Sequence, residues 1–495
     1  MADSETEING APGAVSRGLF RIAPDRDERM HQVAMEMLLT LHQNGYAADT
    51  MDIRSPRRAS LLLRSLVLRD NFVEVGGEHE QLARLLSEGK DFAGSDQMNL
   101  VQESLRTLVD PATRRGSLGT QLMLPVHSAL LWYDVRKRAA TWNPQYVLMR
   151  GTGITLARFL LAPPAAVSEL AAEAAAAVDG VKKALLAPSP FGPIVDQLGD
   201  EHTRPMTSEE KAAWEAAEDP ALEELGRRII RHSSAIMADE SQPREVRLLH
   251  LRRIVALDVA WHMLDAAWTA AQTPPENRYL VVCHAPQERA DNRARVLSED
   301  SYRTANQTLT RGLLAGLRER MRRYAETSRE WDGFFLARSD EEGRSKTGPY
   351  YEELAQEMSD CDASSLDFDA FANRAFDAPG DGYARPIGAL RVMLESCGLV
   401  TGEGRWRYMR ATPSLLAAMV AARPQTGAQE AGEFLHWLHK EWSLVIDEHH
   451  DVGSPRLRGE GSVLQRNGEY FERDLVDADL ATALSDQTCM VGMRA

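Results

Sequence analysis

The chain has 495 residues, a length at which one hydrophobic core no longer suffices, so we expect two to four domains. Hydrophobic residues make up 43% and charged residues 26% of the sequence, a balance that excludes an intrinsically disordered chain. The net charge of -16 excludes a protein that coats nucleic acid non-specifically, because phosphates would be repelled everywhere except at a local basic patch.

The sequence carries no signal for export or membrane insertion. Residues 1–9 are acidic and polar, and no run of about 18 uninterrupted apolar residues follows. The four cysteines lie far apart and include no CxxC pair of the kind that binds metal; they are Cys283, Cys361, Cys397 and Cys489. We therefore expect a cytoplasmic protein with reduced thiols and no membrane partner.

Apolar residues recur mostly at helical spacing, which predicts a mainly α, multidomain protein. We expect a helical body with a few short strands and a C-terminal winged helix-turn-helix domain. The expected parts are a disordered tail at 1–28, an N-terminal helical domain at 29–163, a helical domain with one or two strands at 164–338, a winged-helix domain at 349–423, and a C-terminal helix with an irregular extension at 424–495.

Two features of the body bear on function. An apolar run at 146–149 leads into Gly151 and Gly153 and then a helical pattern, so a strand, a glycine turn and a helix are expected there. Such a turn can cradle a phosphate, but Leu156 replaces the third glycine of the dinucleotide-binding pattern. A second, buried strand is expected at 279–283, followed by a long helix at 299–324.

The order of elements after residue 348 is that of a winged helix. The sequence predicts helices at 350–358 and 368–376, a third helix from Pro386 to Gly398, a hairpin turn at 401–404, a strand at 405–410 and a last helix after Pro413. Alternation in the strand is expected to place Trp406 and Tyr408 on one face and two arginines on the other.

Two interpretations of this segment stay open. In one, the third helix lies in a DNA major groove with Arg385 and Arg391 near phosphates or bases, while Arg405 and Arg407 contact the backbone. In the other, the segment is a module that docks proteins or dimerises, and its arginines are only solvated.

Histidines and acids cluster near the C-terminal end of the chain. His436 and His439 lie three residues apart on a predicted helix face, and His449 or Asp451 could complete a metal site. The spacing fits no zinc motif and HExxH is absent, so a solvated helix end is the competing interpretation and no cofactor is expected.

The pair Arg227 and His232 has the spacing RxxxxH and resembles the active motif of HEPN ribonucleases. The resemblance implies RNA cleavage at a dimer interface, with His232 in acid-base transfer. Arg228 departs from the family's usual smaller polar residue at that position.

The strand at 279–283, with Arg293, Arg295, Ser298, Ser301 and Tyr302 after it, resembles segments of accessory proteins from bacterial multi-gene phage-defence systems. That resemblance implies a non-catalytic component that works beside other proteins of a complex. Our leading hypothesis is thus a non-catalytic adaptor that binds a partner protein or double-stranded DNA. The alternative is a nuclease or metal-dependent hydrolase that uses one of the two candidate sites above.

Overall fold

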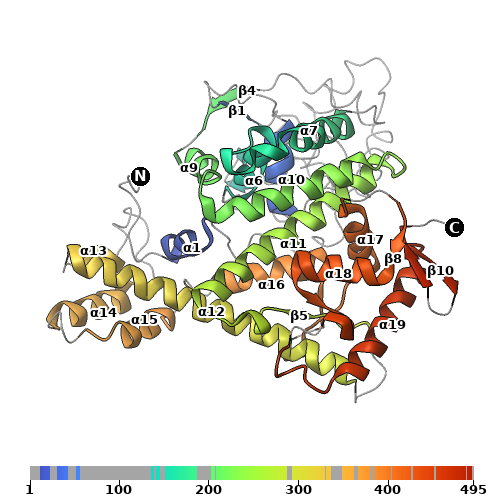
Figure 1. Ribbon diagram of the computed structural model, residues 1–495. Coiled ribbons are helices and arrows are strands. Elements are labelled where there is room, and N and C mark those ends of the chain that lie inside the picture. The colour runs from blue at the N-terminus through green and yellow to red at the C-terminus, as the bar shows by residue number, and fades with distance from the viewer. Residues whose placement is uncertain are drawn as a thin grey trace. The chain divides into compact units, whose positions relative to one another are not determined.

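Helices form most of the structure, as the apolar spacing predicts (Figure 1). The computed structural model describes residues 12–22, 30–42, 52–55, 135–138, 141–144, 151–186, 202–206, 208–286, 292–328, 331–335, 348–361, 366–378, 383, 385–402, 404–424, 427–450, 453–485 and 488–492. Several expectations lie outside these residues, among them the strand at 146–149. No single helix in the described ranges is long and apolar enough to cross a membrane, although the bent pair Thr152–Leu161 and Ala165–Leu185 reaches that length and hydropathy when taken together.

The described chain divides into two units. Unit 1 comprises Met1–Arg29, Ala256–Val420 and Thr426–Ala495, and unit 2 comprises Met30–Val255 and Ala421–Gln425.

Unit 2 is helical, with two antiparallel strand pairs, β1 with β4 and β2 with β3. Its elements are α2 (Met30–His42), β1 (Asp52–Ser55), β2 (Val135–Arg138), β3 (Thr141–Pro144), α6 (Thr152–Leu161), η5 (Ala165–Leu170), α7 (Ala171–Leu186), β4 (His202–Pro205), α9 (Ser208–Ala216), η6 (Pro220–Leu222), α10 (Glu223–Ala238) and the first part of α11 (Arg244–Ala270). Helices α2, α7, α9 and α10 all contact α6, which makes α6 the central helix of the unit.

Unit 1 is built from helices and strands of two to five residues. Its elements are α1 (Pro12–Phe20), the rest of α11, η7 (Pro275–Asn277), β5 (Leu280–Val281), α12 (Arg293–Thr327), α13 (Asp332–Phe335), α14 (Gly348–Asp360), α15 (Phe368–Phe376), α16 (Arg385–Cys397), β6 (Val400–Thr401), η8 (Gly404–Trp406), β7 (Tyr408–Met409), most of α17 (Pro413–Ala422), β8 (Gln429–Glu430), α18 (Ala431–Trp442), β9 (Leu444–Val445), η9 (Glu448–His450), α19 (Gly461–Asp477), β10 (Ala481–Ser485) and β11 (Thr488–Val491). Strands β10, β11 and β8 form a sheet in that order.

Helix α12 organises unit 1. It has 35 residues and is therefore ~52 Å long at about 1.5 Å per residue. It begins where Asn292 accepts a hydrogen bond from the Arg295 N–H, a standard N-cap. It contacts α1, α15, α16, α19, β5 and β7 (Figure 1). Helix α11 approaches closely because Gly312 leaves room for the backbone of Ala267.

Two buried serines of α12 hold the short strands. Ser301 Oγ accepts from the Val281 N–H at 3.0 Å and donates to the Tyr279 carbonyl at 3.5 Å. Ser298 Oγ accepts from the Met409 N–H at 2.8 Å and donates to the Met409 carbonyl at 3.1 Å. Each hydroxyl thus satisfies backbone groups of a strand that lies against the helix, where a buried unpaired donor or acceptor would be costly.

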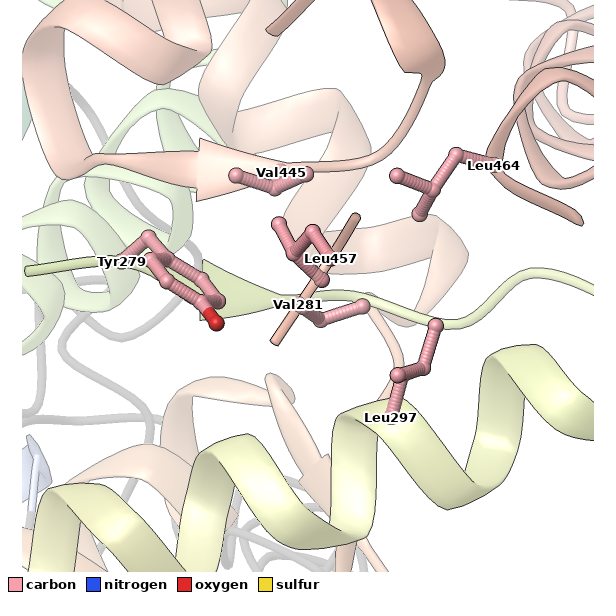
Figure 2. Close-up of a cluster of buried hydrophobic side chains, with 6 residues drawn as sticks. All are labelled: Tyr279, Val281, Leu297, Val445, Leu457 and Leu464. Atoms are coloured by element: carbon pink, nitrogen blue, oxygen red, sulfur yellow. The ribbon is translucent and has the colours of Figure 1, made fainter. Parts of the chain in front are cut away.

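An apolar cluster fills the space between these strands, α12 and α19. Strands β5 and β9 pair in parallel, with Leu280 opposite Leu444 and Val281 opposite Val445. The cluster consists of Tyr279, Val281, Leu297, Val445, Leu457 and Leu464, and all six side chains are buried (Figure 2). The buried strand expected at 279–283 is therefore present, with a shorter regular portion.

Asn467 of α19 joins both strands from the other side. Its Oδ1 accepts from the N–H groups of His284 and Ala285 at 2.7 and 3.2 Å, and its Nδ2 donates to the carbonyls of Val282 and Ile446, each at 2.8 Å. The side chain is buried and its amide is bonded at both ends. The adjacent residue is Gly468, and this allows the close approach, because a Cβ there would lie 2.9 Å from Cβ of Asp447.

The structure corrects two expectations about local structure. Residues 12–20 form α1 rather than part of a disordered tail, because Ala14, Val15 and Phe20 are apolar and become buried. The expected strand at 405–410 is reduced to β7, since Gly402 has φ of +90° and the chain turns through η8 before pairing with β6. Trp406 is exposed and Tyr408 is buried, so the two do not share a face.

The three helices expected after residue 348 form close to their expected bounds. Asp367 caps α15 by accepting from the N–H groups of Asp369 and Ala370, and α16 ends at Gly398 with φ of +97°. Helices α14 and α15 pack against each other, with α13 against α14 and α12 against α15, whereas α16 contacts α12 and β6.

We predict that Asn467→Ala destabilises the protein by about 3 kcal/mol or more, because it leaves one buried N–H group, one partly buried N–H group and two buried carbonyls without their partner. The free energy of unfolding by urea measures the loss. Asn306→Ala is the matched control, since the Asn306 amide makes one partly buried bond to the Tyr302 carbonyl. Equal effects of the two substitutions would contradict the role given to Asn467.

Candidate functional site

Arginines concentrate in one stretch of unit 1. Residues 385–410 carry five arginines and two glutamates, whereas 349–384 carry nine acidic residues and one arginine. Helix α16 and the β6–β7 hairpin are therefore locally basic within an acidic chain. Local positive charge is what a phosphate backbone requires. We call α16 with residues 398–410 the basic surface.

The four predicted nucleic-acid contacts differ in their surroundings. Arg391 is exposed on α16, and Arg385 is half-buried at the first residue of that helix. Arg405 belongs to η8, and its side chain lies outside the described residues. Arg407 donates Nε to Glu395 Oε1 at 2.5 Å and Nη1 to the Gly404 carbonyl at 2.9 Å.

Arg407 is therefore bonded both to α16 and within the hairpin. Its charge is matched by Glu395 of α16, and its second bond closes the hairpin turn on itself. The ion pair ties the tip of the hairpin to the third helix. Of the four predicted arginines, Arg391 is the one whose described side chain is exposed.

Arg391 lies beside this ion pair. Burial raises the pKa of Tyr302, Glu395 raises it further, and Arg407 and Arg391 lower it. All three charges thus act on one phenol of α12. Arg391 is also one turn before Glu395 on α16, so the two side chains share a face.

Trp406 stands at the tip of the hairpin with 55% of its surface exposed. The largest fully buried side chains of the described chain include three other tryptophans, Trp268, Trp331 and Trp442. An exposed indole next to an ion pair is typical of binding surfaces, since the ring offers a large apolar face.

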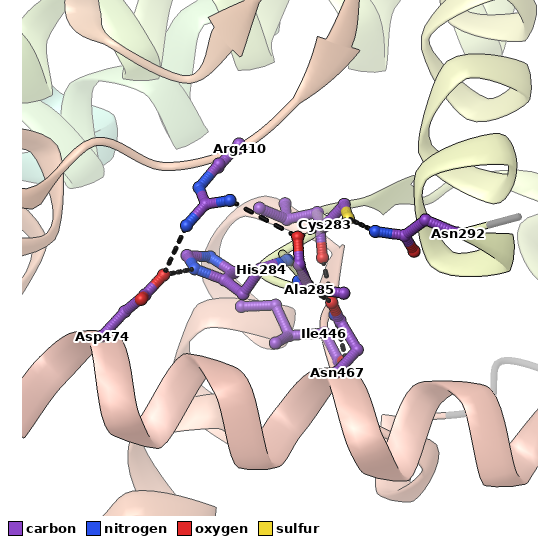
Figure 3. Close-up of polar contacts among 9 residues, drawn as sticks. Cys283, His284, Ala285, Asn292, Arg410, Ile446, Asn467 and Asp474 are labelled. Atoms are coloured by element: carbon purple, nitrogen blue, oxygen red, sulfur yellow. Dashed lines mark hydrogen bonds and ion pairs between the residues drawn. The ribbon is translucent and has the colours of Figure 1, made fainter. Parts of the chain in front are cut away.

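A second group of polar residues surrounds His284, which sequence reasoning missed. His284 Nδ1 lies 2.8 Å from Asp474 Oδ2, and Arg410 donates Nη2 to the same oxygen at 3.3 Å and Nη1 to the Ala285 carbonyl at 3.4 Å (Figure 3). Asp474 lies two turns after Asn467 on α19, so one helix face holds both. Two polar residues seven apart on a helix that is otherwise apolar on that face were the available signal.

The chemistry of this group is that of a buried support. Burial lowers the pKa of His284, so the ring is neutral and Nδ1–H donates to Asp474. Nε2 is buried and has no hydrogen-bond partner among the described residues. Burial raises the pKa of the Cys283 thiol, which points away from the imidazole toward Asn292 (Figure 3). The neighbouring cysteine and histidine therefore do not form a nucleophile and its base.

The ribonuclease-like pair lies on α10. Arg227 forms ion pairs with Glu169 and with Glu223 and donates to the Ala166 carbonyl at 2.9 Å. His232 is buried, with 2% of its surface exposed. Five residues separate the two on a helix, which turns their side chains toward different sides.

The histidines proposed as metal ligands differ in their surroundings. His436 and His449 are exposed, and His439 Nδ1 donates to the Leu444 carbonyl at 3.3 Å. Asp451 lies outside the described residues. Among the residues that the structure describes, no group of three or more His, Cys, Asp or Glu side chains is arranged to hold a metal ion.

A carboxylate of the protein occupies the glycine turn that sequence reasoning weighed as a phosphate cradle. Glu36 of α2 accepts from the Gly151 N–H at 3.1 Å and from the Gly153 N–H at 2.6 Å. Helix α6 has no side-chain cap of its own, so Glu36 supplies the hydrogen-bond acceptor that the N–H groups at its N-terminus need. Both glycines are needed, because a Cβ at Gly153 would lie 2.6 Å from Cβ of Glu36 and one at Gly151 2.5 Å from Cβ of Ala213.

The charge of Glu36 is poised between two opposing effects. Burial raises its pKa to about 7, the backbone donors Gly153, Gly151 and Ile154 lower it, and Glu210 raises it. Only 4% of the residue is exposed, which is why desolvation outweighs the donors. The glycine turn therefore serves the packing of α2 on α6.

Comparison with known proteins gives no match: no family model, curated protein or solved structure is detectably similar to the chain.

We predict that Glu36 makes the stability of unit 2 fall as the pH rises. The folded state keeps this proton to about pH 7, whereas the unfolded chain releases it near the ordinary glutamate pKa of 4.5, so stability decreases between these pH values by roughly 3 kcal/mol. In Glu36→Gln this part of the pH dependence should vanish. Urea unfolding at pH 5, 6, 7 and 8 measures it.

Glu173→Gln, at an exposed position of α7, is the control and should keep the wild-type profile. Identical pH profiles for Glu36→Gln and wild type would contradict the assignment.

Proposed function

We propose that this chain is a non-catalytic binding protein whose 349–423 segment acts as a winged-helix-type module and contacts nucleic acid through the basic surface. The observation that carries the proposal is Arg391, an exposed arginine on the third helix of this segment beside the Glu395–Arg407 ion pair. The order of three helices and a hairpin supports it.

Charge favours nucleic acid over an unspecified surface role. The basic surface is locally positive on a protein whose net charge is -16, so phosphates are attracted to this surface and repelled elsewhere. Contacts to the phosphate backbone position a protein without reading sequence, so binding through arginines alone is expected to be weakly sequence-specific.

The resemblance at 279–302 to accessory proteins of phage defence extends the proposal. We expect a cytoplasmic component that works with other proteins of a complex. Ser298 and Ser301 of that segment hold β7 and β5, so the residues of the resemblance also support the hairpin. The nuclease or hydrolase alternative gains no support from the surroundings of Arg227, His232 or the C-terminal histidines.

We predict that Arg391→Glu weakens binding of a labelled 25-base-pair duplex by about tenfold or more at low salt, because an attractive charge near phosphate becomes repulsive. The slope of log K against log salt should fall by about one. Fluorescence anisotropy at several salt concentrations measures both values.

Arg323→Glu is the control, because it changes the net charge by the same amount at an exposed position of α12. It should bind within about twofold of wild type. Equal losses in the two variants, or the absence of salt-dependent binding in the wild type, would overturn the proposal.

A further inference from the structure

The hairpin holds Trp406 in a fixed place. Gly402 makes the turn possible, since a Cβ there would lie 2.5 Å from the Trp406 carbonyl oxygen. Arg407 closes the turn onto Gly404 and fastens it to Glu395. Strand β7 is itself fixed to α12 through Ser298. The backbone that carries the indole is thus anchored on two helices, and a ligand that binds the ring would order little of it.

The surroundings of the ring indicate what kind of ligand fits. Among the described side chains, the other exposed large hydrophobic residues are Val296 and Leu484, which lie outside the basic surface, so these side chains form no broad apolar patch around the indole. Interface hot spots between proteins lie within such patches. Trp406 instead lies between two arginines in sequence, and one of them, Arg407, pairs with Glu395 of the helix that carries Arg391.

An exposed aromatic ring beside basic side chains is the arrangement used to bind single strands, in which bases stack on the ring and cations follow the phosphates. In a continuous duplex the faces of the bases are covered by their neighbours. An unpaired base leaves its face open to an indole, whatever its identity.

We infer that Trp406 stacks on an unpaired base, so that the nucleic acid held by the basic surface is single-stranded at this point. The inference rests on the proposed function and adds the substrate class to it. Arg391 supplies the positive charge that attracts the phosphates of any nucleic acid. Trp406 supplies the preference for a strand with unpaired bases.

The test compares three probes of equal length with the full chain: a 25-nucleotide single strand, the corresponding duplex, and a single strand that is abasic at every position. Wild type should bind the intact single strand most tightly. Trp406→Ala should lose roughly tenfold or more for that strand and less than about twofold for the duplex. Trp406→Phe, which keeps an aromatic face, should recover part of the loss.

The abasic strand separates stacking from charge. It should bind wild type and Trp406→Ala equally, because it offers phosphates and no bases. The intact strand is offered as DNA and as RNA, and the Trp406-dependent loss identifies which sugar the site accepts.

The two proposals fail in different ways. Equal losses of single strand and duplex in Trp406→Ala, or no loss of either, would overturn the stacking role while Arg391-dependent binding persists. If no probe binds in an Arg391-dependent manner, or if only a protein partner does, the proposed function fails and the inference fails with it.

Discussion

A pair of two-residue strands leaves most neighbouring backbone N–H and C=O groups without a partner in the ladder, and this constraint determines how unit 1 packs. Strands β5, β6, β7 and β9 each have two residues, so most N–H and C=O groups next to them need partners from outside the ladder. Ser298, Ser301 and Asn467 supply those partners from α12 and α19. The two helices therefore act as the missing neighbours of a sheet.

The same constraint supports the candidate site. The Met409 backbone is bonded to Ser298 on one side, and its carbonyl accepts from the Cys283 N–H on the other. One residue further on, Arg410 reaches Asp474 of α19, which also holds His284. The base of the hairpin is thus fixed by three separate segments. Its tip, with Trp406, is held by the Glu395–Arg407 pair.

The helical class and the helices of 349–423 could be predicted because their signals are local. Asp367 precedes an apolar helix and caps it, and Gly398 follows one and ends it. The strand at 405–410 could not be predicted correctly, since the chain turns at Gly402 and through η8, and Arg407 pairs with Glu395 of the preceding helix. Alternating side chains in a short segment predict a strand reliably only where no turn or tertiary contact interrupts the segment.

The polar group around His284 illustrates the same limit over a longer separation. Asp474 and His284 are 190 residues apart, and neither is unusual in its own segment. The glycine turn at Gly151 has a recognisable spacing, but its occupant, Glu36, lies more than a hundred residues earlier. A local sequence pattern can identify backbone N–H groups that need an acceptor. Tertiary packing decides which side chain supplies that acceptor.

Because Glu36 of α2 caps α6, the stability of the first turn of α6 depends on the presence of α2. A helix that carries its own cap can begin to form in isolation, whereas the first turn of α6 meets its acceptor only after the chain has closed a loop of 115 residues. A fragment that starts after α2 would retain every residue of α6 and still lack the group that anchors its beginning. Secondary structure at the centre of unit 2 is for this reason a product of assembly, and its helices should appear together rather than in sequence.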